Sequence, residues 1–119
     1  MIEQLYKQQI IDLYNNPTHK SVIDNPTHHM NGNNPTCGDT IVIQAICNDQ
    51  IISKIKYQGE GCAISQAALN LLIDELIGKP ISVLKEYTPE RIVELLGVPI
   101  SVSRLNCATL GLRTCKKMF

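Results

Sequence analysis

Apolar residues recur at helical spacing near the start of the chain. They are Ile2, Leu5, Tyr6, Ile10, Leu13 and Tyr14. This spacing predicts an amphipathic helix, and the Asn15-Asn16-Pro17 segment that follows predicts its end. Residues 18–34 are rich in Asn, Pro and His and show no clear period. We therefore expect a loop there, with room for one short edge strand.

The middle of the chain has the pattern of a β-hairpin. Residues 40–47 are mostly β-branched and apolar, and Asn48-Asp49 favours a turn. In the return strand, residues 51–57, alternation is expected to place Ile51 and Ser53 on the same face as Tyr57. The Gly59-Glu60-Gly61 segment is expected to end this strand.

Three more helices are predicted after the hairpin. Apolar spacing predicts a helix that places Cys62 at its start and ends at Gly78-Lys79-Pro80. Thr88-Pro89 predicts the start of a short helix that Gly97 ends. A final helix after residue 99 should carry Cys107 near its start. Strands followed by helices predict an α+β fold, with a small antiparallel sheet of about three strands and helices packed on one face.

Composition narrows the class of protein. A chain of 119 residues, 44% of them hydrophobic, is long enough for one hydrophobic core, so we expect a single domain over 1–119. The eleven acidic and eleven basic residues balance, so nucleic acid is not an expected partner. No apolar run approaches the roughly 20 residues that span a bilayer, and the polar start lacks a signal-peptide core. We therefore expect a cytoplasmic protein with no membrane partner.

The chain has five cysteines, which in a reducing cytoplasm are expected to be free, catalytic or metal-bound. Cys37 stands in a glycine-containing turn, and Cys62 and Cys107 stand near expected helix starts, where the helix dipole favours a thiolate. Thiolates suit zinc or iron-sulfur centres, and Asp39 could complete a set of four ligands. The alternative for each cysteine is a small buried apolar residue.

Other candidate ligands have weaker patterns. Cys47 lies within the strand pattern and is expected to be a core residue. Cys115 lies roughly 12 Å beyond Cys107 along the same expected helix, which is too far to bind the same metal. We therefore expect Cys115 to be a core residue as well. The chain has no CxxC pair, which disfavours a zinc ribbon. His19, His28 and His29 are expected to be solvated loop residues that remain reserve ligands.

Three separated motifs carry a resemblance to a known family. They are Asn34-Pro35-Thr36-Cys37-Gly38-Asp39, Gly59-Glu60-Gly61-Cys62-Ala63-Ile64-Ser65 and Arg104-Leu105-Asn106-Cys107-Ala108-Thr109-Leu110. In this order, and with the Tyr-x-Asn-Pro end of the first helix, they resemble the IscU/SufU/NifU N-terminal family of iron-sulfur cluster assembly proteins. The resemblance covers nearly the whole chain. It implies that Cys37, Cys62 and Cys107, with Asp39, hold zinc or iron as a 2Fe-2S cluster.

The motifs are closest to the SufU branch, which has Gly-Glu-Gly-Cys-x-Ile-Ser and Cys-Ala-Thr-Leu. The short spacing between Cys62 and Cys107 is instead similar to that of IscU. IscU has a histidine where this chain has Asn106, and only the final positive charge of its chaperone-binding segment remains, at Arg104. Arg104 resembles the SufU arginine, which would favour the Cys107 thiolate. The alternative is a solvated surface arginine.

The resemblance implies a sulfur acceptor or scaffold rather than a conventional enzyme. Its partners would be a SufS/IscS-like cysteine desulfurase and downstream iron-sulfur acceptor proteins. In a transfer mechanism the three thiolates hold zinc, and Cys37 leaves the metal to accept persulfide sulfur; in a scaffold mechanism they build a labile 2Fe-2S cluster. We favour transfer. Two other classes remain open, namely a cysteine-nucleophile hydrolase and a structural zinc module.

Overall fold

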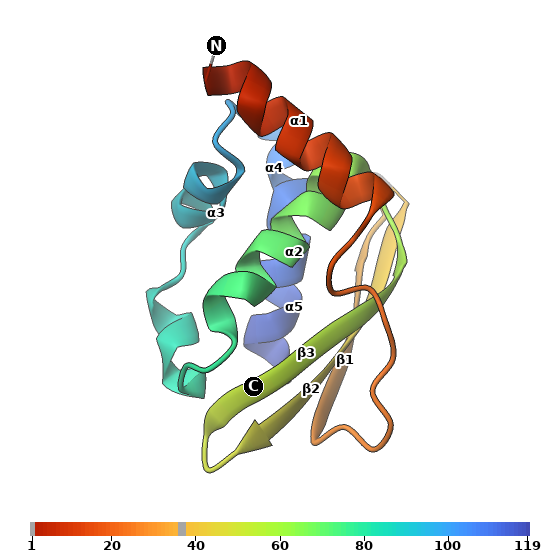
Figure 1. Ribbon diagram of the computed structural model, residues 1–119, viewed down its shortest axis with the longest axis vertical. Helices are drawn as coiled ribbons and strands as arrows, with labels where there is room; N and C mark the ends of the chain where they lie inside the picture. Colours follow the sequence, from red (N-terminus) through yellow and green to blue (C-terminus); the bar gives the residue numbers. More distant parts are fainter. Residues whose placement is uncertain (1, 36–37) are drawn as a thin grey trace.

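The computed structural model describes residues 2–35 and 38–119, and Figure 1 shows its architecture. The elements in chain order are α1 (Ile2–Asn15), β1 (His28–Asn34), β2 (Asp39–Asn48), β3 (Ile51–Glu60), α2 (Ala63–Leu76), the 3₁₀ helix η1 (Ile81–Glu86), α3 (Pro89–Leu96), α4 (Val102–Ala108) and α5 (Leu110–Met118). The first helix, the hairpin, α2 and α3 all occur where the sequence pattern predicts them. The short 3₁₀ helix was not predicted.

A three-stranded antiparallel sheet has the order β1-β2-β3, with β2 in the centre. Along β2 the residues Ile41, Ile43 and Ala45 are buried and their neighbours are more exposed, as the two-residue period of a strand requires. The helices α2 and α5 pack on the buried face (Figure 1). The expected α+β fold, with helices on one face of a small antiparallel sheet, is confirmed.

The face assignment predicted for the return strand is wrong in its first half. Ile51 and Ser53 are exposed, whereas Ile52 is buried with Ile55 and Tyr57. The register shifts between Ile46 and Cys47, whose partners are Lys54 and Ile52, so Ser53 is an extra residue in β3. Its hydroxyl donates a hydrogen bond to the Ile46 carbonyl at 3.0 Å. This β-bulge reverses the alternation, which a simple two-residue period does not predict.

The return strand, β3, also runs further than predicted, because Gly59 lies inside it and does not end it. Its φ of +127° is a conformation that side chains rarely allow, and an added Cβ would collide with the carbonyl oxygen of Thr40. With glycine at this position, β3 stays paired with β2 as far as the Thr40–Glu60 pair. The pairing brings the first residue of β2 next to the start of α2.

The central helix, α2, packs against α1, α3, α4 and α5. Its buried apolar residues form the middle of the core, and they are Ala67, Ala68, Leu69, Leu72, Ile73 and Leu76. Burying a leucine or isoleucine side chain contributes about 1.5–3 kcal/mol. The start of α2 is therefore held in place by packing along the rest of the helix.

The single final helix that was expected is two helices, α4 and α5, which meet at Thr109. The Thr109 hydroxyl donates to the carbonyl of Leu105 at 2.9 Å, and the Arg113 guanidinium donates to the carbonyl of Asn106 at 2.7 Å. Such side-chain bonds to backbone carbonyls compete with regular helical pairing. As a result, Cys107 lies near the end of α4 and not at a helix start.

The chain between α1 and β1 covers the free edge of β3. Residue Lys20 forms a parallel bridge with Tyr57, and the backbone of His19 and Ser21 bonds the backbone of Tyr57 on both sides. Covering an edge strand in this way protects its unpaired backbone groups. Within the described part of the chain, no helix has the length and apolar character needed to cross a membrane.

We predict that Gly59→Ala destabilises the protein by about 3 kcal/mol or more, because the collision with Thr40 adds to the backbone strain. Gly78 is the matched control, since its φ is +86° but an added Cβ would meet nothing within 4 Å. Gly78→Ala should therefore cost only about 1–2 kcal/mol. Urea unfolding curves of the two variants measure the difference. Equal losses of unfolding free energy would show that the close approach of β2 and β3 at Gly59 is unimportant.

Candidate metal centre

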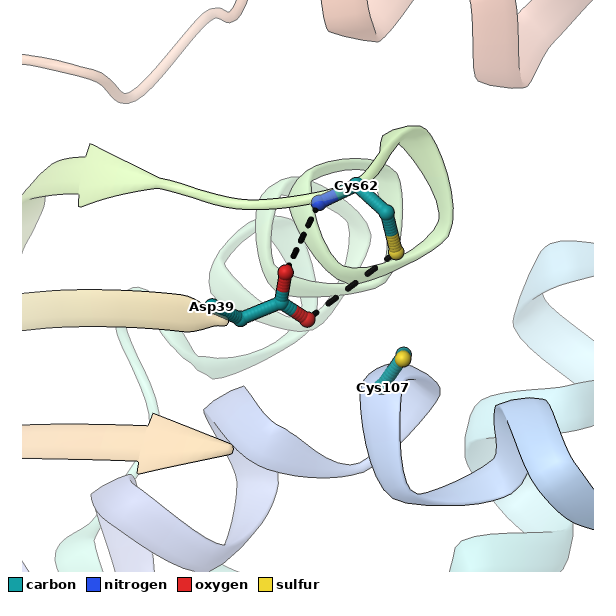
Figure 2. A group of neighbouring side chains, drawn as sticks. All are labelled: Asp39, Cys62 and Cys107. Atoms are coloured by element: carbon teal, nitrogen blue, oxygen red, sulfur yellow. Dashed lines mark hydrogen bonds between the residues drawn. The ribbon is translucent and has the colours of Figure 1, made fainter. Parts of the chain in front are cut away.

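Three side chains with metal-binding atoms converge at one end of the sheet (Figure 2). Asp39 is the first residue of β2, Cys62 directly precedes the first residue of α2, and Cys107 lies in α4. One carboxylate oxygen and the two sulfur atoms all lie within 4.8 Å of one another. The fourth expected ligand, Cys37, lies outside the residues that the structure describes. Three of the four residues expected at the site are thus brought together from distant parts of the sequence.

Asp39 is 2% exposed and makes two contacts with Cys62. Its Oδ1 accepts a hydrogen bond from the Cys62 amide at 3.0 Å, and its Oδ2 lies 4.0 Å from the Cys62 sulfur. The carboxylate therefore caps α2 from another element, at the positive end of the helix dipole. An added Cβ on Gly61 would lie 3.2 Å from the Asp39 carboxyl carbon and 2.5 Å from the Ser65 hydroxyl. Glycine at this position leaves room for the carboxylate.

Cys62 is partly exposed at the start of α2, as expected. Cys107 differs from the expectation, because it is fully buried and lies one residue before the end of α4. The expected position of Cys107 at the start of its own helix is therefore wrong. The side-chain amide of Asn34 lies 3.6 Å from the Cys107 sulfur. An amide N–H is a hydrogen-bond donor that favours negative charge on sulfur.

Asn34 is a site residue that sequence reasoning missed. It is buried at the end of β1, directly across the sheet from Asp39. A buried asparagine needs partners for its amide, and one of its donors faces Cys107. Its place at the start of the Cys37 motif was the available signal. Without the sheet register, nothing in the sequence links it to a cysteine far along the chain.

The donor set fits a tetrahedral metal. Zinc binds cysteine sulfur at about 2.3 Å, so ligand atoms around it stand about 3.8 Å apart. The oxygen of Asp39 and the sulfurs of Cys62 and Cys107 need to close by only about 1 Å from their present limit of 4.8 Å. Two soft sulfurs with a carboxylate suit zinc, and they also suit iron.

A polar pocket of about 640 Å³ gives access to two of the three residues. It is lined by Tyr14, Asn15, Lys20, Gly38, Asp39, Glu60, Gly61, Cys62 and Gln66. Cys107 does not line this pocket, so Asp39 and Cys62 form the accessible side of the centre. Pocket residues from α1 and from the segment that covers β3 were not predicted, because they come together only through tertiary packing.

Among the described cysteines, Cys47 and Cys115 lie outside this cluster. Cys115 is fully buried, and its burial raises the pKa of its thiol to about 12. Burial also raises the pKa of Cys47. Both thiols therefore stay protonated near neutral pH, which disfavours metal binding. Cys115 is a core residue, as expected, whereas Cys47 is only partly buried and packs against the core.

The expectation of solvated histidines is wrong for His19. This residue is buried, and its Nε2 lies 2.6 Å from Asp74. His28 and His29 lie on strand β1 and not in a loop. His28 is partly buried and contacts the ring of Phe119, whereas His29 is exposed. Among the described residues, the metal-binding cluster contains no histidine. Arg104 is exposed on α4, and within the described chain its guanidinium makes no hydrogen bond.

Comparison with known proteins assigns the family. The family model named NifU-like N terminal domain matches residues 5–118 of the chain. The chain belongs to this family. This NifU-like domain is 33% identical to the zinc-dependent sulfurtransferase SufU of Bacillus subtilis, over 98% of the chain and 90% of that relative. It is also 30% identical to the iron-sulfur cluster assembly scaffold protein IscU of Thermotoga maritima, over 66% of the chain and 56% of that relative.

Solved structures agree with the fold of this NifU-like domain. A crystal structure from Fervidobacterium islandicum, assigned as a cluster assembly scaffold protein for the SUF system, superposes with a TM-score of 0.82 at 25% identity. The match covers 98% of this chain and 97% of that one. The N-terminal part of a NifU-like protein from Brucella abortus has a TM-score of 0.77 at 15% identity, which shows the shared fold. The expected family is confirmed.

We predict that Asp39→Ala lowers the unfolding free energy of the metal-free protein by about 1–2 kcal/mol, because the Cys62 amide loses its acceptor. Asp39→Asn keeps a side-chain oxygen for this amide and is the matched control. Asp39→Asn should keep most of the unfolding free energy that Asp39→Ala loses. Chemical unfolding of both variants in the presence of a chelator measures the effect. An alanine variant as stable as the asparagine variant would show that the cap contributes nothing.

Proposed function

We propose that this protein accepts persulfide sulfur from a cysteine desulfurase and delivers it for iron-sulfur cluster assembly. The proposed site consists of Cys37, Asp39, Cys62 and Cys107. The observation that supports it most is the convergence of Asp39, Cys62 and Cys107 from three separate elements within 4.8 Å. A carboxylate and two thiols form this cluster, and the carboxylate also bonds the Cys62 amide at the start of α2. Such a set of donors suits a metal with exchangeable ligands.

Zinc is the metal that we propose for the resting site. The SufU relative, named as zinc-dependent, matches 98% of this chain at 33% identity, whereas the IscU relative from Aquifex aeolicus matches 92% at 27%. Zinc has no redox chemistry and keeps bound thiols in the thiolate form. Cys62, Cys107 and Asp39 would hold the ion in place, since all three are anchored by the packing of β2, α2 and α4.

Cys37 is the proposed sulfur acceptor. Its thiolate would attack the terminal sulfur of the desulfurase persulfide and form a new S–S bond. The S–S bond of the donor breaks, its electron pair stays on the desulfurase cysteine, and that cysteine leaves as a thiolate. The two described cysteines of the cluster are less suited to this step, because Cys107 is 0% exposed and Cys62 is tied to α2. The polar pocket beside Asp39 is where the donor would approach.

A scaffold role is the second candidate. The same donors suit iron, and relatives from Thermotoga maritima and Aquifex aeolicus are named as scaffold proteins. In that case iron and sulfide are substrates that assemble on the cysteines and then leave. Metal analysis and an anaerobic absorption spectrum of freshly isolated protein distinguish the two roles, since only an iron-sulfur cluster absorbs strongly in the visible range.

We predict one metal ion per chain, lost in Cys62→Ser and in Cys107→Ser. Cys47→Ser and Cys115→Ser are the matched controls, because these thiols have raised pKa values and lie outside the cluster. Both controls should keep a full complement of metal. Elemental analysis after gel filtration measures the content. Loss of metal from either control, with retention in Cys62→Ser, would contradict the proposed ligand set.

We predict that the protein accelerates a cognate desulfurase and that the transferred sulfur is found on Cys37. The test incubates the desulfurase, free cysteine and the wild-type protein or Cys37→Ser, and locates the added sulfur by mass spectrometry. Cys47→Ser is the control and should accept sulfur at the wild-type rate. Unchanged sulfur acceptance by Cys37→Ser would refute the acceptor assignment, and no acceleration by the wild-type protein would favour the scaffold role.

A further inference from the structure

A buried hydrogen-bond network runs from the pocket into the protein. It consists of Gln66, Tyr57, Asn70 and His19, which are at most 7% exposed. The Tyr57 hydroxyl is 2.8 Å from Gln66 Oε1, and Asn70 Nδ2 is 2.8 Å from the Tyr57 hydroxyl. The backbone amide of His19 donates to Asn70 Oδ1 at 2.9 Å. The network joins α2 to β3 and to the segment that covers its edge.

The direction of every hydrogen bond in this network follows from one backbone group. The amide of His19 can only donate, so the side-chain atom of Asn70 that faces it must be the oxygen. The other end of Asn70 is then the NH₂ group, which donates to the Tyr57 hydroxyl and to the carbonyl of Gln66. Tyr57 has only one hydrogen, and it must go to Gln66. The side chain of Gln66 therefore presents its oxygen to Tyr57.

This orientation leaves the NH₂ group of Gln66 for the pocket. Among the described residues, Gln66 Nε2 has no hydrogen-bond partner. If it were fully buried, it would be a buried nitrogen without a partner, and among the described side chains His19 Nδ1 is the only such atom. Gln66 Nε2 is therefore not fully buried, and Gln66 is one of the residues that line the pocket beside Cys62. Gln66 is also one helical turn after Cys62, and helical side chains lean toward the N-terminus.

We propose that Gln66 is a catalytic residue whose amide N–H donates a hydrogen bond to the sulfur of the persulfide donor. This inference rests on the proposed function. When the accepting thiolate attacks the terminal sulfur, the S–S bond of the donor breaks and negative charge collects on the leaving sulfur. A donor held in a fixed direction stabilises that charge without reorganising. Tyr57 and Asn70 are positioning residues, because they hold the amide of Gln66 in this orientation.

The charges in the pocket favour a neutral donor at this position. The charge of Asp39 would be offset by the zinc ion that it is proposed to bind, so Glu60 is the carboxylate of the pocket lining that opposes the arrival of negative charge. Lys20 is the cation among the described pocket residues, but its side chain is exposed and flexible. The amide of Gln66 is instead held by buried partners. It can stabilise a leaving thiolate at a defined position without forming an ion pair with the carboxylates.

The test uses glutathione persulfide as a small sulfur donor, so that the result does not depend on a protein partner. The rate of sulfur uptake by the zinc-loaded protein is measured against donor concentration by mass spectrometry. Gln66→Met keeps the length of the side chain and removes the donor. We expect its maximal rate to fall about tenfold or more, with the half-saturating concentration changed less than about twofold. Zinc content should be unchanged.

Gln58→Met is the matched control, because Gln58 is exposed on β3 and lies outside the pocket. It should react like the wild type. Tyr57→Phe frees the amide of Gln66 to turn, and it should lower the maximal rate by a smaller factor. If Gln66→Met does not fold, Gln66→Glu replaces it, since a carboxylate still accepts from Tyr57 but cannot donate to sulfur.

Wild-type uptake rates in the folded Gln66 variant would overturn the inference, and so would an equal loss of rate in Gln58→Met. Failure of the proposed function gives a different result. In that case the wild-type protein takes no sulfur from a desulfurase, while uptake from glutathione persulfide still depends on Gln66. A wild-type protein that takes sulfur from neither donor overturns both.

Discussion

The hydrogen bond between the Cys62 amide and Asp39 is the interaction on which the site depends. It joins the first residue of the central strand to the start of the central helix, and so it connects the sheet to the helical layer at one point. The bond forms only because β3 remains paired with β2 up to Glu60, and that pairing requires glycine at position 59. Strand register, helix capping and ligand placement therefore follow from the same local geometry.

Much of the architecture was predictable from local patterns. Helical spacing, the Thr88 cap and the alternation in β2 are each determined by residues near one another in the sequence, and the structure agrees with them. The failures have non-local or competing causes. The bulge at Ser53 reverses a strand face, Gly59 allows a strand to continue, and the Thr109 hydroxyl divides a helix. A periodic pattern contains no information about these side-chain and backbone contacts.

The candidate site shows the same division. The motifs indicated Asp39, Cys62 and Cys107, and the structure places them together. Sequence reasoning gave Cys107 the wrong environment, since the expected helix start is a helix end close to Asn34. It also missed the orientation of Gln66 and the burial of His19, because both depend on partners in other elements. Residue identity was readable from the motifs, whereas the groups that orient each residue were not.

The wide separation of the converging residues links metal binding to folding. Asp39 and Cys62 are 23 residues apart, and Cys107 is in a third element. An ion bound to all of them would close two long loops, and the unfolded chain has no comparable site. By mass action, the bound ion would stabilise the folded state as its free concentration rises above the dissociation constant. The same protein would therefore resist heat and proteolysis according to the metal supply of its surroundings.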